Sequence, residues 1–221
     1  MSMNGFSTLI VFFFLIAVIA GFVYLIYKLV LLSRKKLTEQ FKKIGDKYGL
    51  ELEPGDLKYY KQQKNTVLKG SIKGHDFICF TYCVGSDEKS KVEWTEFTLQ
   101  HNLNVEGYNL RLVGENVFRK MGKGLGAIKD LEIGVQDFDK RFLIESEKLS
   151  TTRSLLNGNV REKLLTIPVN TYFGELSINA KELCYKIPRA LNENGNDTGV
   201  HFETALDASV LILDELKRVY K

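Results

Sequence analysis

The stretch LIVFFFLIAVIAGFVYLIY, residues Leu9–Tyr27, is apolar throughout and contains no charged residue. After Lys28 the apolar character continues to Leu32, so residues 9–32 would form a helix of about 36 Å at 1.5 Å per residue. A helix of that length crosses a hydrocarbon core of roughly 30 Å with some tilt. The stretch therefore predicts a single transmembrane helix over residues 9–32, preceded by a short N-terminal tail, residues 1–8.

A cleaved signal peptide is the main alternative to a permanent anchor. Val18-Ile19-Ala20 offers small residues for cleavage. However, the residues before Leu9 include no Lys or Arg, and the apolar run continues well beyond Ala20. These features favour an uncleaved signal-anchor.

Basic residues follow the apolar stretch, whereas none precedes it. By the positive-inside rule this asymmetry predicts a short N-terminus outside the cell and a C-terminal domain in the cytoplasm, if the membrane is a bacterial inner membrane. The candidates for contact with the membrane surface are Lys28, which lies within the span, and the basic residues after it, Arg34, Lys35, Lys36, Lys42 and Lys43.

The net charge of +4 is concentrated near the membrane. Residues 33–64 carry nine basic and five acidic side chains, whereas residues 65–221 carry 21 basic and 22 acidic ones. The nearly neutral remainder argues against nucleic acid as a partner, because a nucleic-acid-binding domain needs a basic face. The basic segment instead suits anionic lipid headgroups, at about 1 kcal/mol per basic residue near the surface.

Residues 33–64 are interpreted as a juxtamembrane stalk helix and a linker. Leu37, Phe41, Ile44 and Tyr48 recur at helical spacing and form one apolar stripe, and Gly49 is a plausible helix end. The stripe favours a stalk helix that packs on the soluble domain. The alternatives are an interfacial helix and a helix that pairs with a second copy of the chain.

Residues 65–221 predict one soluble α+β domain. β-rich runs flank Gly74 and predict a hairpin. With further strands at residues 92–103 and 108–113, four strands in about fifty residues suggest an antiparallel meander. Additional predicted elements are short helices at 150–156 and 160–167, the second capped by Asn159, paired strands at 173–178 and 183–187, and a long C-terminal amphipathic helix at 202–220.

Two polar segments were weighed as chemical sites. Lys120, Gly122, Lys123 and Gly124 could present backbone N–H groups and positive charge to a phosphate, although a basic loop is the favoured interpretation because the P-loop spacing is missing. The acidic segment that ends at Asp139 could bind a metal. We favour a turn, with Phe138 and Phe142 in the core and Asp139 as a local cap.

The remaining reactive side chains form no recognisable set in the sequence. Cys79, Cys83 and Cys184 lack zinc-binding spacing and are interpreted as reduced thiols. The three histidines, His75, His101 and His201, fall in different predicted elements. The sequence thus predicts no catalytic residue, metal or cofactor, and leaves enzymatic activity open while favouring a non-enzyme.

One motif carries a resemblance to a group of proteins. The pattern Gly-x-x-x-Phe-Asp-x-x-Phe, followed by an apolar helix with Arg and Leu, resembles bacterial single-pass membrane-anchored proteins of unknown function. The resemblance implies a compact α+β domain over roughly residues 65–180, and it implies no reaction. The residues that carry it are Gly134, Phe138, Asp139, Phe142, Leu156, Arg161 and Leu165.

The function expected from the sequence is a membrane-tethered binding or scaffold domain whose basic stalk rests on lipid. The lipid bilayer is the expected partner. A second copy or another membrane protein could also pair with the anchor, where Ala17 and Gly21 are four residues apart. The alternative is a membrane-bound enzyme that acts on a phosphorylated or lipid-linked substrate through the loop Lys120–Gly126.

Overall fold

The computed structural model describes residues 3–53, 67–84, 92–105, 107–114, 131–168, 173–189, 191 and 196–220. The chain divides into two compact units, Met1–Glu39 and Gln40–Lys221, and each is described by itself. Helix α1, Met3–Tyr48, begins in the first unit and ends in the second. The second unit therefore takes in the end of the segment that the sequence analysis assigned to the stalk.

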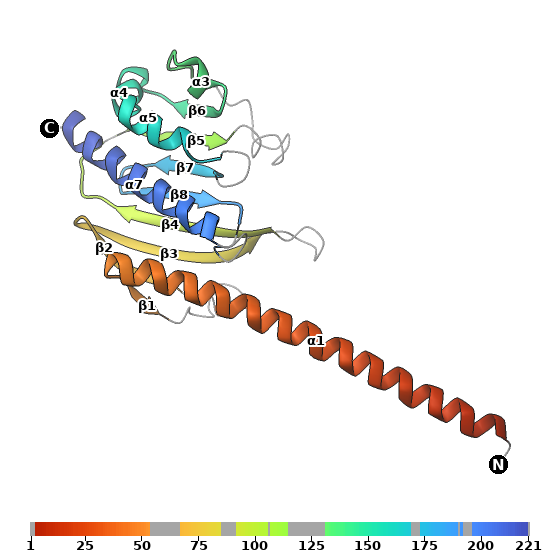
Figure 1. Cartoon of the computed structure of the whole chain (residues 1–221). Coiled ribbons are helices and arrows are strands. Elements are labelled where there is room, and N and C mark those ends of the chain that lie inside the picture. Colours follow the sequence, from red (N-terminus) through yellow and green to blue (C-terminus); the bar gives the residue numbers. More distant parts are fainter. Residues whose placement is uncertain are drawn as a thin grey trace. The chain divides into compact units, whose positions relative to one another are not determined.

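The first unit is the long N-terminal part of α1, drawn in red in Figure 1. Within the described residues, the segment from Leu9 onward is the one helix long and apolar enough to cross a membrane, judged by length and composition. None of its apolar window is buried. The prediction of a helix over the apolar stretch is confirmed.

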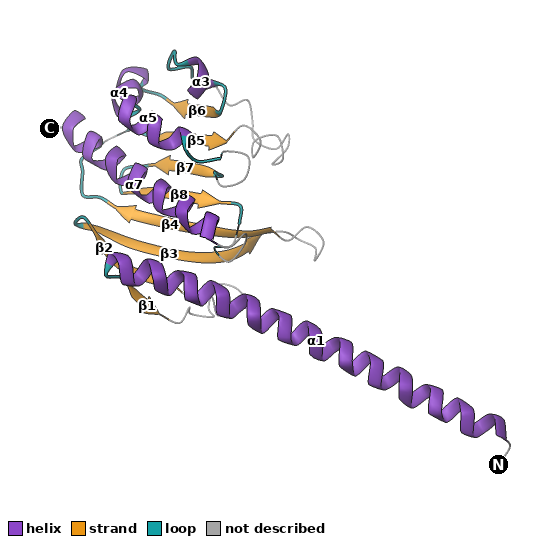
Figure 2. Ribbon diagram, viewed as in Figure 1, coloured by secondary structure: helices purple, strands orange, loops and turns teal. Residues whose placement is uncertain are grey.

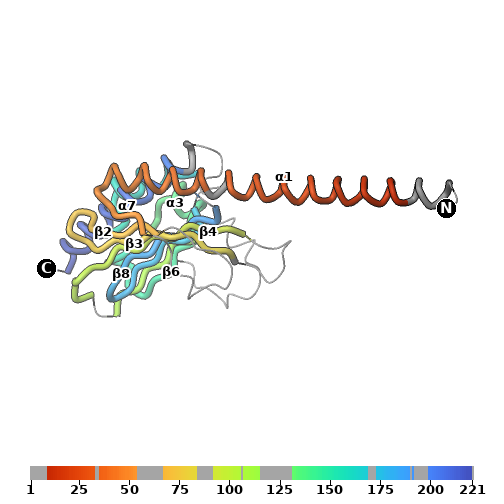
Figure 3. The backbone as a smooth tube through the Cα atoms, turned by 90° about the horizontal axis from the view of Figure 1, so that it is seen from below, coloured from red at the N-terminus to blue at the C-terminus, as the bar shows by residue number. Residues whose placement is uncertain are grey.

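The second unit is an α+β domain built on one antiparallel sheet, as the sequence predicted (Figure 2). Its eight strands lie in the order β1-β2-β3-β4-β8-β7-β5-β6, and Figure 3 shows them as a twisted layer. The strands are β1 (Glu51–Glu53), β2 (Val67–Ile72), β3 (His75–Val84), β4 (Val92–Gln100), β5 (Leu110–Gly114), β6 (Phe142–Ser146), β7 (Glu175–Ile178) and β8 (Glu182–Ile187).

The β2–β3 hairpin forms where the sequence predicted it. Its two-residue turn, Lys73-Gly74, has positive φ at both positions, 49° and 81°. A turn with left-handed backbone at both central residues matches the twist of the flanking strands. The turn fixes the register that brings Ile72 opposite His75.

The predicted four-strand meander is wrong beyond β4. β2, β3 and β4 are sequential neighbours, but β4 next pairs with β8, and β5 lies between β7 and β6. The hairpin of β7 and β8, which the sequence did predict, thus joins the two halves of the sheet. Local strand patterns carry no information about a partner 80 residues away, so this arrangement could not be predicted from them.

Besides the end of α1, the described residues of the domain form four helices: α3 (Gln136–Asp139), α4 (Leu149–Leu155), α5 (Gly158–Leu165) and α7 (Asn196–Val219). α7 runs along the sheet and contacts α4, α5 and β8 (Figure 1). It begins earlier than the predicted residue 202. The cap of α5 is Asn157 rather than the predicted Asn159, because its side chain accepts a hydrogen bond from the Val160 N–H.

Aromatic side chains fill the core between the sheet and α7. The Phe97 ring lies 5.1 Å from Tyr185 and 5.2 Å from Phe202, measured between ring centroids. Phe173 joins this group to Phe142. The close packing leaves little space at Gly174, where an added Cβ would lie 2.6 Å from the Lys186 carbonyl oxygen.

Candidate membrane-tethering segment and polar sites

The apolar part of α1 has the surface of a membrane-spanning helix. Every residue from Leu9 to Leu32 is exposed, on all faces of the helix. Soluble proteins rarely expose a contiguous apolar surface of this extent. In a bilayer the same surface would be buried in hydrocarbon, and the helix would satisfy its own backbone groups.

The predicted basic residues that the structure describes are exposed. Lys28, Lys35, Lys36, Lys42 and Lys43 all present their side chains to the surface of α1. Arg34 lies in the same helix, but its side chain is outside the described residues. Among these residues, the ion pair that the structure shows is that of Lys35 with Glu39, at 3.9 Å. The lysines therefore remain available to an external anion.

The apolar stripe of the stalk is used inside the domain. Within the second unit, Phe41 is 0 % exposed and Ile44 is 2 % exposed. This outcome confirms the favoured prediction that the stalk packs on the soluble part. An interfacial or self-pairing helix would need Phe41 and Ile44 on its surface, so the structure contradicts both alternatives at these positions.

The end of α1 is fixed closely against β2. Gly49 adopts a φ of +67°, and the Leu50 N–H donates to the Gly45 carbonyl oxygen at 2.8 Å. This is the pattern of a Schellman cap, which satisfies the last carbonyl groups of a helix. A Cβ at Gly45 would lie 3.1 Å from Leu68, so the small residue permits the close approach.

An ion pair also ties this end of α1 to α7. The Lys47 ammonium donates to the Glu203 carboxylate, and this hydrogen bond raises the pKa of Lys47. Both residues belong to the second compact unit. Lys47 is therefore part of the domain's internal packing and is not counted with the free stalk lysines.

The acidic segment before β6 is a closed structural turn. The Asp139 carboxylate accepts hydrogen bonds from the backbone N–H groups of Ile133, Gly134 and Val135, at 3.1, 3.0 and 2.8 Å. Three successive N–H groups would suit an external anion, but the chain's own carboxylate occupies them. Phe138 and Phe142 are buried, as predicted.

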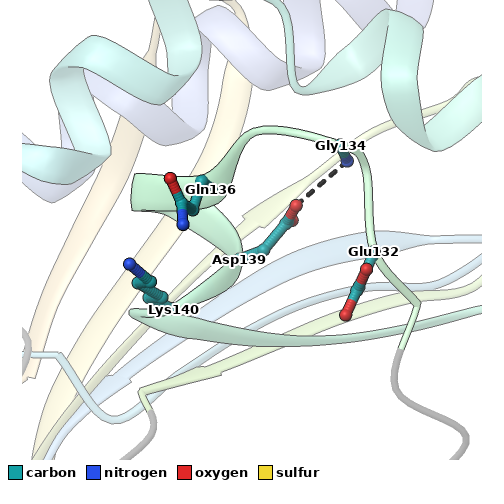
Figure 4. A pocket seen from close by; sticks show the side chains of 5 residues that line it. All are labelled: Glu132, Gly134, Gln136, Asp139 and Lys140. Carbon is teal, nitrogen blue, oxygen red and sulfur yellow. Dashed lines mark hydrogen bonds between the residues drawn. The ribbon is translucent and has the colours of Figure 1, made fainter.

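An open pocket of about 380 Å³ lies beside this turn (Figure 4). Its lining combines opposite charges, and in the picture Asp139 turns back toward the Gly134 backbone rather than into free space. The pocket is lined by Glu132, Gly134, Gln136, Asp139 and Lys140. The Asp139 carboxylate in this pocket already accepts three backbone hydrogen bonds, so most of its capacity to bind a ligand is used within the chain.

The candidate anion loop, with Lys120, Gly122, Lys123 and Gly124, lies outside the described residues. Within the described part of the chain, no group of three or more His, Cys, Asp or Glu side chains is arranged to hold a metal ion. Cys79 and Cys184 are buried and Cys83 is exposed, and the three cysteines are not joined in disulfides. Burial raises the pKa of the Cys79 and Cys184 thiols and keeps them protonated.

Two histidines that sequence reasoning regarded as scattered lie at one end of the sheet. His75 is 4 % exposed and His101 is 5 % exposed. The Lys217 ammonium of α7 lies 3.1 Å from His75 Nε2. We call His75, His101 and Lys217 the histidine corner. His75 and Lys217 are 142 residues apart, so no sequence spacing could have indicated their contact.

A row of alternating charges crosses the sheet on the face away from the core. Lys186 lies 3.6 Å from Glu96, and Arg111 lies 2.9 Å from Glu175 and 3.3 Å from Glu145. Hydrogen bonding to Glu175 raises the pKa of Arg111. These residues come from five strands, β4 to β6 in sheet order, and were missed because the strand order was unknown. The row holds two basic and three acidic side chains, and each of the five takes part in an ion pair within it.

No protein-family model matches the chain, and no curated protein matches it in sequence. Among solved structures, the fold is similar to the crystal structure of the mycobacterial trehalose monomycolate transport factor A, TtfA. The TM-score is 0.52 at 14 % sequence identity, and the match covers 81 % of this chain and 94 % of that one. At this identity the likeness concerns the fold.

Proposed function

We propose that this protein is a single-pass, membrane-tethered and non-enzymatic domain that acts as an accessory factor in the transport of a lipid. The observation that carries the proposal is helix α1. It joins a fully exposed apolar segment, residues 9–32, to residues that are buried within the folded domain, Phe41 and Ile44. One element thus supplies both the anchor and a part of the domain's core.

The short connection supports a position at the membrane surface. Only residues 33–39 separate the apolar segment from the unit that starts at Gln40. Such a connection spans about 10 Å as a helix and at most about 25 Å when extended. A domain held on so short a tether stays near the headgroups.

The exposed lysines of α1 support contact with anionic lipid. Folding uses Phe41 and Ile44 on one side of α1, while Lys35, Lys36, Lys42 and Lys43 stay exposed. Basic groups near a cytoplasmic leaflet contribute about 1 kcal/mol each. We therefore assign these four residues, with Lys28 and Arg34, to the membrane surface. We place the domain in the cytoplasm, because the same basic residues come directly after the apolar segment.

The likeness to TtfA supports the transport role. That protein is named a transport factor for trehalose monomycolate, and we extend to this chain only the general role of an accessory in lipid transport. The ligand of this chain is left unspecified. Its partners would be the bilayer and either a second copy or another membrane protein. The resemblance to bacterial membrane-anchored proteins agrees with this assignment.

Acetylation of lysines in the full-length chain tests the lipid contact. The chain is placed in nanodiscs made of neutral lipid or of neutral lipid with about one-third anionic lipid, and the label at each lysine is quantified by mass spectrometry. We expect anionic lipid to protect Lys35, Lys36, Lys42 and Lys43. Raising the salt to about 1 M should remove the protection, because the Debye length then falls to about 3 Å.

Lys140 and Lys181 serve as internal controls for this experiment, because both are exposed in the domain and neither is assigned to the membrane. Their labelling should not depend on the lipid. Equal labelling of the four stalk lysines in both kinds of nanodisc would refute the lipid contact, while the tethering by α1 would still stand.

A further inference from the structure

The histidine corner holds His75 in one tautomer. Its Nδ1 lies 2.9 Å from the Gln100 carbonyl oxygen, which can only accept a hydrogen bond. Nδ1 therefore carries the proton and donates it. Nε2 then has a lone pair and accepts from the Lys217 ammonium at 3.1 Å.

His101 is held in the opposite tautomer by the same reasoning. Its Nε2 lies 3.1 Å from the Asn179 carbonyl oxygen and donates to it, while its Nδ1 accepts from the Leu103 N–H at 3.4 Å. The ring links the end of β4 to the turn between β7 and β8. Burial lowers the pKa of His101, and the hydrogen bond to the Asn179 carbonyl oxygen offsets a part of this effect.

In each ring the nitrogen that would take up a proton already accepts a hydrogen bond: His75 Nε2 from Lys217, and His101 Nδ1 from the Leu103 N–H. Protonated His75 would present an N–H and a positive charge to the Lys217 ammonium. Protonated His101 would present an N–H to the Leu103 N–H. Each histidine is fully satisfied only when it is neutral, and each loses one hydrogen bond when it gains a proton.

From this geometry we propose that the histidine corner is an acid-sensitive latch, in which protonation of His75 breaks its contact with Lys217 and releases the last turn of α7 from the sheet, while protonation of His101 breaks its contact with Leu103. The last turn contains Lys217 and Arg218; Arg218 is already exposed, so release of the turn would newly expose the positive charge of Lys217. The side chain of Lys217 is only half-buried and can move into solvent.

Other charged groups around the corner modify this response. On α7, Lys217 opposes protonation of His75. On β8, Glu182 favours the protonated form of His101 and therefore promotes the acid response, but its effect is smaller than that of burial. Asp76, the neighbour of His75 on β3, is exposed on the sheet. Among the described residues, Lys217 is the charged group in direct contact with the His75 ring.

Hydrogen exchange of the full-length chain in nanodiscs tests the latch. Exchange of the last turn of α7 is compared at pH 7.5 and pH 5, after correction for the chemical exchange rate, with α4 and α5 as the reference. If one proton is linked to opening, protection of the last turn should fall about tenfold for each pH unit below the titration. The reference helices should change much less.

The His75→Gln variant is the first matched test. Glutamine retains one donor and one acceptor but takes up no proton in this range. The acid-induced loss of protection should shrink in this variant and vanish in His75→Gln/His101→Gln. An unchanged loss in the double variant, or an equal loss in the reference helices, would overturn the proposal.

Lys217→Met distinguishes a latch from a purely structural contact. Without Lys217 a proton on His75 no longer meets a cation, so the additional loss of protection at pH 5 should be much smaller in this variant than in the natural chain. A structural contact alone would predict faster exchange at both pH values by the same factor. That second outcome would also overturn the proposal, even if the glutamine variants failed to fold.

Discussion

At the scale of single residues, Asp139 shows how a charge can be structural. Its carboxylate closes the turn by accepting three backbone N–H groups, and the same residue belongs to the motif that suggested a protein family. Gly134 supplies a φ of +86° in this turn, and Arg161 donates to the Leu156 carbonyl oxygen at 2.6 Å. These motif residues therefore hold the local backbone in place.

We expect Asp139→Ala to lower the free energy of unfolding by about 2–3 kcal/mol, because three backbone donors lose a charged acceptor. Thermal unfolding of the full-length chain in detergent would measure the change. Asp137→Ala is the matched control, because Asp137 is exposed in the same short helix. Equal melting temperatures of the two variants would contradict the structural role of Asp139.

Tyr108 gives a prediction for alkaline pH. Burial raises the pKa of Tyr108 to about 12, against 10 for an exposed phenol. The unfolded chain therefore releases this proton first. The stability that the neutral phenol contributes is complete below pH 10 and is lost as the pH rises toward 12, in total roughly 2–3 kcal/mol.

Denaturant midpoints at pH 9 and pH 11 would measure this loss. Tyr108→Phe keeps the ring and removes the phenol, and Thr152 retains its bonds to Ser146 and the Lys148 carbonyl oxygen. The variant should lose less stability over this range than the natural protein. The same slope in both would show that Tyr108 does not titrate as the structure implies.

At the scale of secondary-structure elements, substitutions at the end of α1 distinguish a stalk that packs in the domain from one that lies in lipid. Phe41→Ala should cost about 3–5 kcal/mol of domain stability, because it empties a fully buried site. The exposed neighbour Lys42, changed to Ala, should cost less than about 0.5 kcal/mol. Chemical denaturation followed by the fluorescence of Trp94 would compare them, and similar midpoints would contradict the packing.

Elements of local origin could be predicted from the sequence, and those of distant origin could not. The apolar stretch, the turn at Gly74 and the stripe through Phe41 each depend on residues close in the chain. β5 also pairs with β7, whose residues are more than 60 positions away in the sequence, and this pairing places β5 between β7 and β6. The histidine corner and the row of charges through Arg111 depend on that strand order, which is why the sequence analysis found neither.

At the scale of the whole molecule, the basic residues after the apolar segment predict on which side of the membrane the domain lies. In spheroplasts we expect an added protease to leave the domain intact until the cells are lysed, because Arg34, Lys35 and Lys36 follow the anchor and no basic residue precedes it. Immunoblotting of the C-terminal domain would follow the digestion. Cleavage in unlysed spheroplasts would place the domain outside the cytoplasm.

The hairpin of β7 and β8 has a consequence for biosynthesis. The anchor leaves the ribosome first and engages the membrane, while β4 and β5 are still without the partners that unite the sheet. Until Ile187 has been made, the nascent chain holds two separate sheet fragments with open edges, which are prone to pair with other chains. A chain that stops before Glu175 would keep its anchor and lack a joined sheet, so quality control at the membrane would meet such chains as tethered, incompletely folded products.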